Sequence, residues 1–231
     1  MERVPEPELM EEKEQVISYD EADFSEGEVN LINQINQYLL KKNISLGEKD
    51  LIVDLGCGPG NISEKLAIKW PNTAVLGIDG SKEMIMRAEH NKRICVNQRN
   101  LKNLRYICSD IKEIKLNNLL PKKEISLLVS NSLIHHITYI EDFFNTIKSL
   151  SSNSTVNFHK DLKRPIDEKS ALELKEQCSK TYNETLTNDY YASLKASYTF
   201  KELKNFTLEN NLSSLEVFED GDKYLIVYGN V

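Results

Sequence analysis

The chain has 231 residues, four cysteines and a formal net charge of −7, and no apolar run in it is long enough to span a membrane. This charge argues against nucleic acid or an anionic membrane surface as a partner. The length fits one domain with a sizeable core, and the cysteines are too widely spaced for a C-x-x-C pair. We therefore expect a cytoplasmic protein with reduced thiols.

The first 27 residues form an acidic arm. Between Glu2 and Glu28, eleven acidic and two basic side chains give a charge of −9, so the rest of the chain carries +2. With Pro5 and Pro7, this composition predicts an arm that is partly disordered or lies over the surface. We divide the chain into this arm, residues 1–27, and one domain, residues 28–231.

Hydrophobic periodicity from Glu28 onward predicts helices that alternate with strands. Helices are expected from Glu28 to near Gly47, over Asn61–Lys69, from Ser81, and over Glu141–Leu150. Strands are expected over Leu51–Leu55, Thr73–Asp79, Leu104–Cys108, Glu124–Val129 and Thr155–Phe158. This alternation is typical of a parallel sheet whose strands are joined by crossover helices.

The last third of the chain departs from this alternation. Strands at Leu215–Phe218 and Tyr224–Tyr228 flank a polar turn with glycine and predict a β-hairpin. Residues 164–197 form a helical segment, which we interpret as a cap over the site. The tyrosines in this segment and directly after it would line that site or form an ordinary amphipathic helix face; they are Tyr182, Tyr190, Tyr191 and Tyr198.

The most informative motif is DLGCGPGN, residues 54–61, where an apolar strand meets a helix through alternating glycines. Glycines at such a turn allow backbone N–H groups to approach a ligand. The dinucleotide pattern G-x-G-x-x-G would need glycine where Asn61 stands. In addition, the Asp54 carboxylate would repel a pyrophosphate but attract an ammonium group, so the motif favours a cofactor that carries an amino acid.

Two further acids follow the next two strands. Asp79 ends the second strand about twenty residues after the turn, where a carboxylate can accept both hydroxyls of a ribose. Asp110 follows the third strand and can accept a hydrogen bond from an adenine amino group, beside the backbone N–H of Ile111. Each acid has a structural alternative, since Asp79 can cap the helix from Ser81 and Asp110 can cap its own loop.

These motifs resemble those of the class I S-adenosylmethionine-dependent methyltransferases of small-molecule type. The resemblance extends over about residues 30–160, and the opening RVPEPELM of residues 3–10 is similar to one subgroup. It implies a Rossmann-like fold with a mostly parallel seven-stranded sheet, a C-terminal antiparallel hairpin and a helical cap. It also implies S-adenosyl-L-methionine as cofactor, a small-molecule acceptor, and no metal, with a homodimer left open. The residues it implies for cofactor binding are Tyr19, Asp54, Gly56, Cys57, Gly58, Gly60, Asp79, Gly80, Met84, Asp110, Ile111 and Asn131.

The candidate catalytic residues are His135 and His136, which follow the fourth strand at the end where ligands bind in such sheets. A sulfonium is already an activated methyl donor, so a base is needed only if the acceptor carries a proton. Either histidine would take that proton or orient the acceptor; the alternative is that both are structural. His159 and Asp161, after the fifth strand, are weaker candidates.

Other functions remain open. A cofactor-binding protein of this fold without methyltransferase activity is the main alternative. A nicotinamide oxidoreductase is disfavoured by Asp54 and Asn61. Methylation of a nucleic-acid amino group is disfavoured too, because the segment NSLI, residues 131–134, lacks the prolines of the [DNS]-P-P-[YF] motif.

Overall fold

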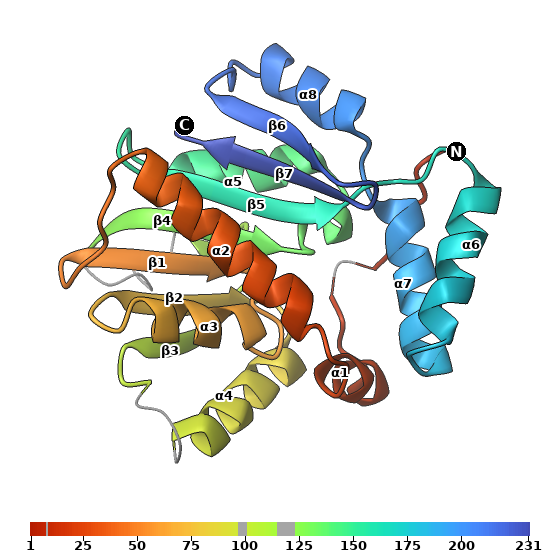
Figure 1. The fold of residues 1–231 in the computed structure, drawn as a ribbon, viewed down its shortest axis with the longest axis horizontal. Coiled ribbons are helices and arrows are strands. Elements are labelled where there is room, and N and C mark those ends of the chain that lie inside the picture. Colours follow the sequence, from red (N-terminus) through yellow and green to blue (C-terminus); the bar gives the residue numbers. More distant parts are fainter. Residues whose placement is uncertain (8, 97–100, 115–122) are drawn as a thin grey trace.

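The computed structural model describes residues 1–7, 9–96, 101–114 and 123–231; Glu8 of the arm motif lies outside these ranges. A seven-stranded sheet has the order β3-β2-β1-β4-β5-β7-β6 (Figure 1). Its strands are β1 (Asp50–Leu55), β2 (Ala74–Asp79), β3 (Leu104–Cys108), β4 (Glu124–Asn131), β5 (Val156–Leu162), β6 (Leu215–Asp220) and β7 (Tyr224–Gly229). Strands β1 to β5 pair in parallel, and β7 is antiparallel to both β5 and β6. The predicted fold class is therefore confirmed.

The described helices lie around this sheet. They are α1 (Lys13–Asp20), α2 (Ser25–Lys41), α3 (Asn61–Lys69), α4 (Lys82–Val96), the short 3-10 helix η2 (Ile134–His136), α5 (Ile140–Leu150), α6 (Glu168–Ser179), α7 (Glu184–Ala196) and α8 (Phe200–Glu209). Helices α6 and α7 lie beyond the carboxyl ends of the parallel strands (Figure 1). No helix in the described part of the chain combines the length and apolarity that crossing a membrane requires.

Two apolar clusters fill the two sides of the sheet. One joins Ile35 of α2 to Ile52 of β1, and the other joins Phe143 of α5 to Val53 of the same strand. Because successive side chains of a strand point to opposite faces, β1 contributes to both clusters. Asp54 therefore shares the face of α2 and α3, which explains why it meets a residue of α3 below.

Several element boundaries differ from the sequence prediction. Helix α2 begins at Ser25, three residues before the expected Glu28, and ends at Lys41, well before Gly47. Strand β5 continues to Leu162, four residues beyond the expected end at Phe158. All seven residues of β5 are buried, and its polar side chains are paired, so polarity there does not mark the end of the strand.

The arm is ordered against the domain in all its described residues. It contains α1, which the sequence analysis missed, and it lies near α7 and the ends of the parallel strands (Figure 1). Arg3 donates hydrogen bonds to backbone carbonyls in and after η2 and to that of Ala196. Ser81 Oγ donates to the carbonyl of Met10 at 2.7 Å. These contacts hold the arm against the segments that follow β2 and β4 and against the segment predicted as the cap.

Candidate active site

The alternating glycines between β1 and α3 each adopt a left-handed backbone conformation, with φ of 65° at Gly56, 52° at Gly58 and 95° at Gly60. A Cβ at Gly56 would lie 2.6 Å from Leu133, and one at Gly60 would lie 2.3 Å from the Tyr106 hydroxyl. At Gly58 nothing lies within 4 Å of that position. The three glycines therefore serve a tight strand-to-helix turn, and Gly58 leaves the turn open on one side.

Asp54 stands at the end of β1 and is buried, with 1% of its surface exposed. Its carboxylate accepts a hydrogen bond from Ser63 Oγ of α3 at 2.6 Å. Burial raises the pKa of Asp54 to about 7, although the Ser63 bond opposes this. A cationic group placed beside this carboxylate would relieve the cost of ionising it.

Asp79 links the glycine turn to the start of α4. One carboxylate oxygen accepts from the backbone N–H of Gly58 at 2.9 Å, and the other accepts from Ser81 N at 2.8 Å. Burial raises the pKa of Asp79, while these two backbone bonds oppose the rise. The cap of α4 is Ser81, whose Oγ accepts from Met84 N at 3.2 Å. Each Asp79 oxygen keeps a second lone pair for a ligand hydroxyl.

Asp110 follows β3 and is 42% exposed at its side chain. It accepts a hydrogen bond from Lys112 N at 2.8 Å, which is the loop-capping contact anticipated as its alternative role. Neighbouring Ile111 and the α4 residue Met84 are both buried apolar side chains. Together they supply two apolar surfaces and one acceptor, which a flat heteroaromatic ring with an amino group would match.

One cavity of about 940 Å³ brings the predicted site together. It lies between the ends of the parallel strands, the arm, and helices α6 and α7. Gly60 is the one predicted site residue that does not line it, because Gly60 packs against Tyr106 behind the turn. The predicted residues that do line it are Tyr19, Asp54, Gly56, Cys57, Gly58, Asp79, Gly80, Met84, Asp110, Ile111, Asn131, His135 and His136.

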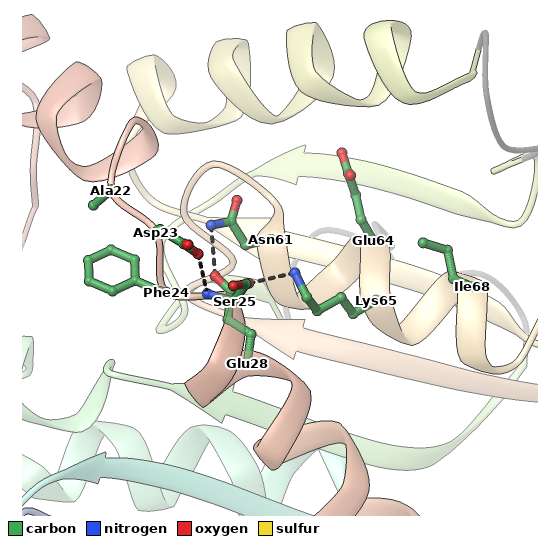
Figure 2. A pocket seen from close by; sticks show the side chains of 9 residues that line it. All are labelled: Ala22, Asp23, Phe24, Ser25, Glu28, Asn61, Glu64, Lys65 and Ile68. Atoms are coloured by element: carbon green, nitrogen blue, oxygen red, sulfur yellow. Dashed lines mark hydrogen bonds and ion pairs between the residues drawn. The ribbon is translucent and has the colours of Figure 1, made fainter.

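Asn61, which stands where the dinucleotide pattern would have glycine, has a structural contact of its own. Its Nδ2 donates to Glu28 Oε1 of α2 at 2.9 Å, and Lys65 Nζ contacts the other Glu28 oxygen at 2.5 Å (Figure 2). These residues line a smaller cavity of about 270 Å³ at the start of α2 and α3. Glu28 and Asn61 line the larger cavity as well, so this triad forms part of its wall.

Tyr19 belongs to an aromatic group that joins the arm to α6 and α7. Its ring lies 5.0 Å from that of Phe24, which in turn lies 5.6 Å from Tyr182. The Tyr182 hydroxyl donates to the Asp23 carbonyl at 3.0 Å. Tyr182 and Tyr190 line the cavity, whereas Tyr191 and Tyr198 are absent from its lining. Two of the four predicted tyrosines therefore line the cavity, and both belong to residues 164–197.

His135 and His136 lie in η2, directly after β4, and both line the cavity. The Nδ1 atom of His135 is hydrogen-bonded to a carboxylate oxygen of Asp161. Burial lowers the pKa of His135, but Asp161 and Glu6 outweigh it, so that pKa is raised overall. Burial and His135 lower the pKa of His136 to about 3. The centroids of the two rings are 4.4 Å apart. The surroundings thus favour the protonated form of His135 and the neutral form of His136.

The two weaker catalytic candidates, His159 and Asp161, have different surroundings in the structure. His159 is fully buried, does not line the cavity, and bonds through Nδ1 to Ser130 Oγ at 2.9 Å. Asp161 is buried too, but it also accepts from the backbone N–H groups of Ile134 at 2.5 Å and Leu162 at 2.7 Å. Asp161 is thereby placed to orient His135, whereas His159 is a core residue.

Glu6 is the site residue that the sequence analysis did not select. Its Oε1 lies 3.5 Å from His135 Nε2 and 3.4 Å from His136 Nδ1, and Ser193 of α7 donates to it at 3.1 Å. Burial raises the pKa of Glu6. An acid in an acidic arm gives no local signal, because its partners lie about 130 and 190 residues away in sequence.

The sheet order, the antiparallel β7 and the ligand cavity at the carboxyl ends of the strands define a Rossmann-like methyltransferase domain. A model of the family described as "Methyltransferase domain" matches residues 46–202. The chain therefore belongs to the class I S-adenosylmethionine-dependent methyltransferase family, as the motifs predict.

Individual relatives are more distant. The chain is 28% identical over 100 residues to a trans-aconitate 2-methyltransferase of Mycobacterium tuberculosis, a match that covers 43% of this chain and 32% of that protein. It thus spans about a third of that relative's length. The plantazolicin methyltransferase BpumL, solved with a desmethylplantazolicin analogue and S-adenosylhomocysteine, has a TM-score of 0.68 at 16% identity, covering 95% of this chain and 91% of that one. A SAM-dependent methyltransferase from Aquifex aeolicus has a TM-score of 0.62 at 18% identity, covering 95% and 98%. These two structures show the same fold.

Proposed function

We propose that this chain transfers the methyl group of S-adenosyl-L-methionine to a small-molecule acceptor in the cavity of about 940 Å³. One observation supports this most. Asp54, Asp79 and Asp110, which end or follow β1, β2 and β3, line the same cavity as the two histidines of η2. The three acids suit an extended cofactor, and the histidines suit an acceptor.

The cofactor would lie along the ends of the three strands. The Asp54 carboxylate would face the ammonium of the methionine portion, and Asp79 would accept the ribose hydroxyls. Asp110 would accept from the adenine amino group, with Met84 and Ile111 on the ring. The other lining residues with a proposed cofactor contact are Tyr19, Gly56, Cys57, Gly58, Gly80 and Asn131. Gly60 would act indirectly, by allowing the turn to pack on Tyr106.

The acceptor would lie against His135 and His136. In the reaction its nucleophile forms a bond to the methyl carbon, and the carbon–sulfur bond breaks with its electron pair remaining on sulfur. The products are the methylated acceptor and S-adenosylhomocysteine. Where the acceptor atom carries a proton, His135 of the lining would receive it, since Asp161 behind its ring favours the imidazolium.

The charge of the lining constrains the acceptor. Ten carboxylate side chains and three lysines line the cavity. Of these, Lys160 is paired with Asp220 at 2.6 Å and Glu28 with Lys65 at 2.5 Å, which leaves the acids in the majority. A polycarboxylate such as trans-aconitate would therefore be repelled. Tyr190 and Tyr182 instead offer aromatic surface. We propose a neutral or cationic acceptor with an apolar or aromatic body and one nucleophilic atom.

The domain boundaries follow from this assignment. We propose that residues 1–27 cover the cavity from the cofactor to the histidines of η2, and that residues 164–197, which contain α6 and α7, form the cap that selects the acceptor. Residues 28–231 would then constitute the methyltransferase domain, with the cap inserted in it. The homodimer stays a prediction, which light scattering of the purified chain would test.

A substrate screen tests the proposal directly. The full chain is incubated with S-adenosylmethionine and pools of small molecules, and both S-adenosylhomocysteine and methylated products are followed by mass spectrometry. The Asp79→Ala variant, which removes the proposed ribose contact, should lose cofactor affinity and turnover together. Unchanged binding by that variant would contradict the cofactor assignment, and cofactor binding without any turnover would support a binding protein instead.

A further inference from the structure

A cluster of three side chains lies at the proposed acceptor side of the cavity, with exposed fractions of 10% for Glu6, 3% for His135 and 16% for His136. It consists of Glu6 from the arm and His135 and His136 from η2, and all three line the cavity. Each offers one ligand atom, and these atoms all lie within 4.8 Å of one another. From the sequence alone we expect no metal. Glu6 lies about 130 residues from the two histidines, so no local motif joins the three.

The spacing within the cluster fits ligands around a common ion better than direct hydrogen bonds. Glu6 Oε1 lies 3.5 Å from His135 Nε2 and 3.4 Å from His136 Nδ1. A hydrogen bond between such atoms has a usual length of about 2.7–3.2 Å. In contrast, an ion with four tetrahedral ligands at about 2.0–2.2 Å separates neighbouring ligand atoms by about 3.3–3.6 Å.

Two of the three proposed ligands, His135 and Glu6, are held in place by hydrogen bonds to neighbouring side chains. Asp161 holds His135 through its Nδ1, which leaves the Nε2 lone pair directed at Glu6 and the cavity. Ser193 Oγ donates to Glu6 Oε1 at 3.1 Å. A carboxylate behind a histidine ligand is the usual outer-shell arrangement of protein metal sites, where it fixes the tautomer and strengthens the ligand.

The charges beside the cluster are compatible with a bound cation. Asp161 is hydrogen-bonded to His135, Glu6 lies 3.5 Å from the same ring, and Arg3 donates to the His135 carbonyl. Two carboxyl groups and one guanidinium group therefore surround the histidines, and a dication held between Glu6 and the imidazoles would be attracted to both carboxylates.

We propose that Glu6, His135 and His136 bind one divalent transition-metal ion of the zinc type, leaving a fourth coordination position open to the cavity. Two imidazoles and one carboxylate are a donor set typical of catalytic zinc, and of iron(II) when more positions are open. Hard ions such as Mg²⁺ prefer oxygen ligands and are a poor match. The ion would also join the arm to η2 across the mouth of the cavity.

This site would deepen the methyl transfer proposed above, and only its use in catalysis rests on that proposal. A hydroxyl or similar group of the acceptor that occupies the open position would lose its proton more easily, because the ion stabilises the resulting anion. The deprotonated atom would then be the nucleophile for the methyl carbon. His135 would then act as an ion ligand, and the proton would pass to a carboxylate of the lining such as Asp189, whose Oδ2 has no hydrogen-bond partner among the described residues.

Metal binding is tested on the full-length chain without an affinity tag, after chelator treatment and dialysis. Zn²⁺ is titrated by calorimetry, and Co²⁺ is added separately because its visible absorption reports nitrogen and oxygen ligands in tetrahedral geometry. The test variants are Glu6→Gln and His136→Gln. The matched controls are Glu12→Gln, another arm acid that lines the cavity, and His90→Gln on the exposed side of α4.

We expect one Zn²⁺ per chain, with affinity at least 100-fold weaker in both test variants and within about threefold of the original in both controls. Asp161→Asn should weaken it about 10- to 100-fold while keeping one site. No stoichiometric binding, or equal loss in a control, would overturn the proposal. Folding of each variant is verified by circular dichroism and by S-adenosylhomocysteine binding. That second measurement also separates the two proposals, because cofactor binding without zinc would reject this site alone.

Discussion

The pH dependence of cofactor binding is the most direct consequence of the Asp54 environment. Burial raises the pKa of Asp54 to about 7, so the empty site carries a largely protonated carboxyl in mildly acidic solution. A ligand ammonium group binds the ionised form. Acidification should therefore weaken binding, because protons compete for the same carboxylate.

The magnitude follows from the ionisation of Asp54. With a pKa of about 7, Asp54 is about 3% ionised at about pH 5.5 and about 70% ionised at about pH 7.4. The ligand's α-amino group belongs to a free amino acid, whose carboxylate keeps it protonated at both pH values. The ratio of the two ionised fractions of Asp54 therefore predicts affinity about 20-fold weaker at about pH 5.5.

The assay is calorimetric titration with S-adenosylhomocysteine, which carries the same amino acid, ribose and adenine as the cofactor but does not react. The control is Asp54→Asn, which keeps a partner for Ser63 but cannot ionise. It should bind more weakly near neutral pH, and its affinity should depend much less on pH. The remaining dependence would report Asp79, whose pKa is also raised by burial.

Two results would refute this reasoning. One is an affinity of the unmodified chain that is constant between about pH 5.5 and 7.4, since a fixed carboxylate pKa near 7 cannot give that. The other is the same pH dependence in Asp54→Asn as in the unmodified chain, which would assign the titration to another group.

Two further predictions concern stability. Gly60→Ala should lower the free energy of unfolding by about 2 kcal/mol or more, because φ is 95° and the new Cβ would lie 2.3 Å from the Tyr106 hydroxyl. Urea unfolding measures this, and Tyr106→Phe in the same chain should recover part of it; no recovery would deny the clash. His159 has its pKa lowered to about 3 by burial, so between about pH 6.5 and 4 the unfolded chain takes up a proton that the folded chain does not, and stability falls by about 3 kcal/mol. His159→Gln should remove that part of the acid sensitivity, and equal slopes of stability against pH in both proteins would contradict it.

Much of the fold could be predicted because its signals are local. The apolar run ending at Asp54 and the glycine turn after it depend only on neighbouring residues, and the structure places β1 and α3 where they indicate. Helix α8 was missed although Thr199 and Glu202 form a capping box, a signal that the sequence does carry. Helix α1 was missed for a better reason: only Val16 and Ser18 are buried, so it lacks an apolar stripe.

The sequence by itself indicated the family, through the resemblance of its motifs, and it determined most of the strands and helices and the residues placed at the ends of β1, β2 and β3. The elements follow from periodicity and turn chemistry, which act over a few residues. Only the tertiary structure decided that Gly60 faces Tyr106 and that Glu6 meets His135 beside Asp161. The physical reason is that these contacts join segments more than 25 residues apart in sequence. Such distant segments meet through the packing of the whole sheet, the arm and the helices of the cap, which no local pattern encodes.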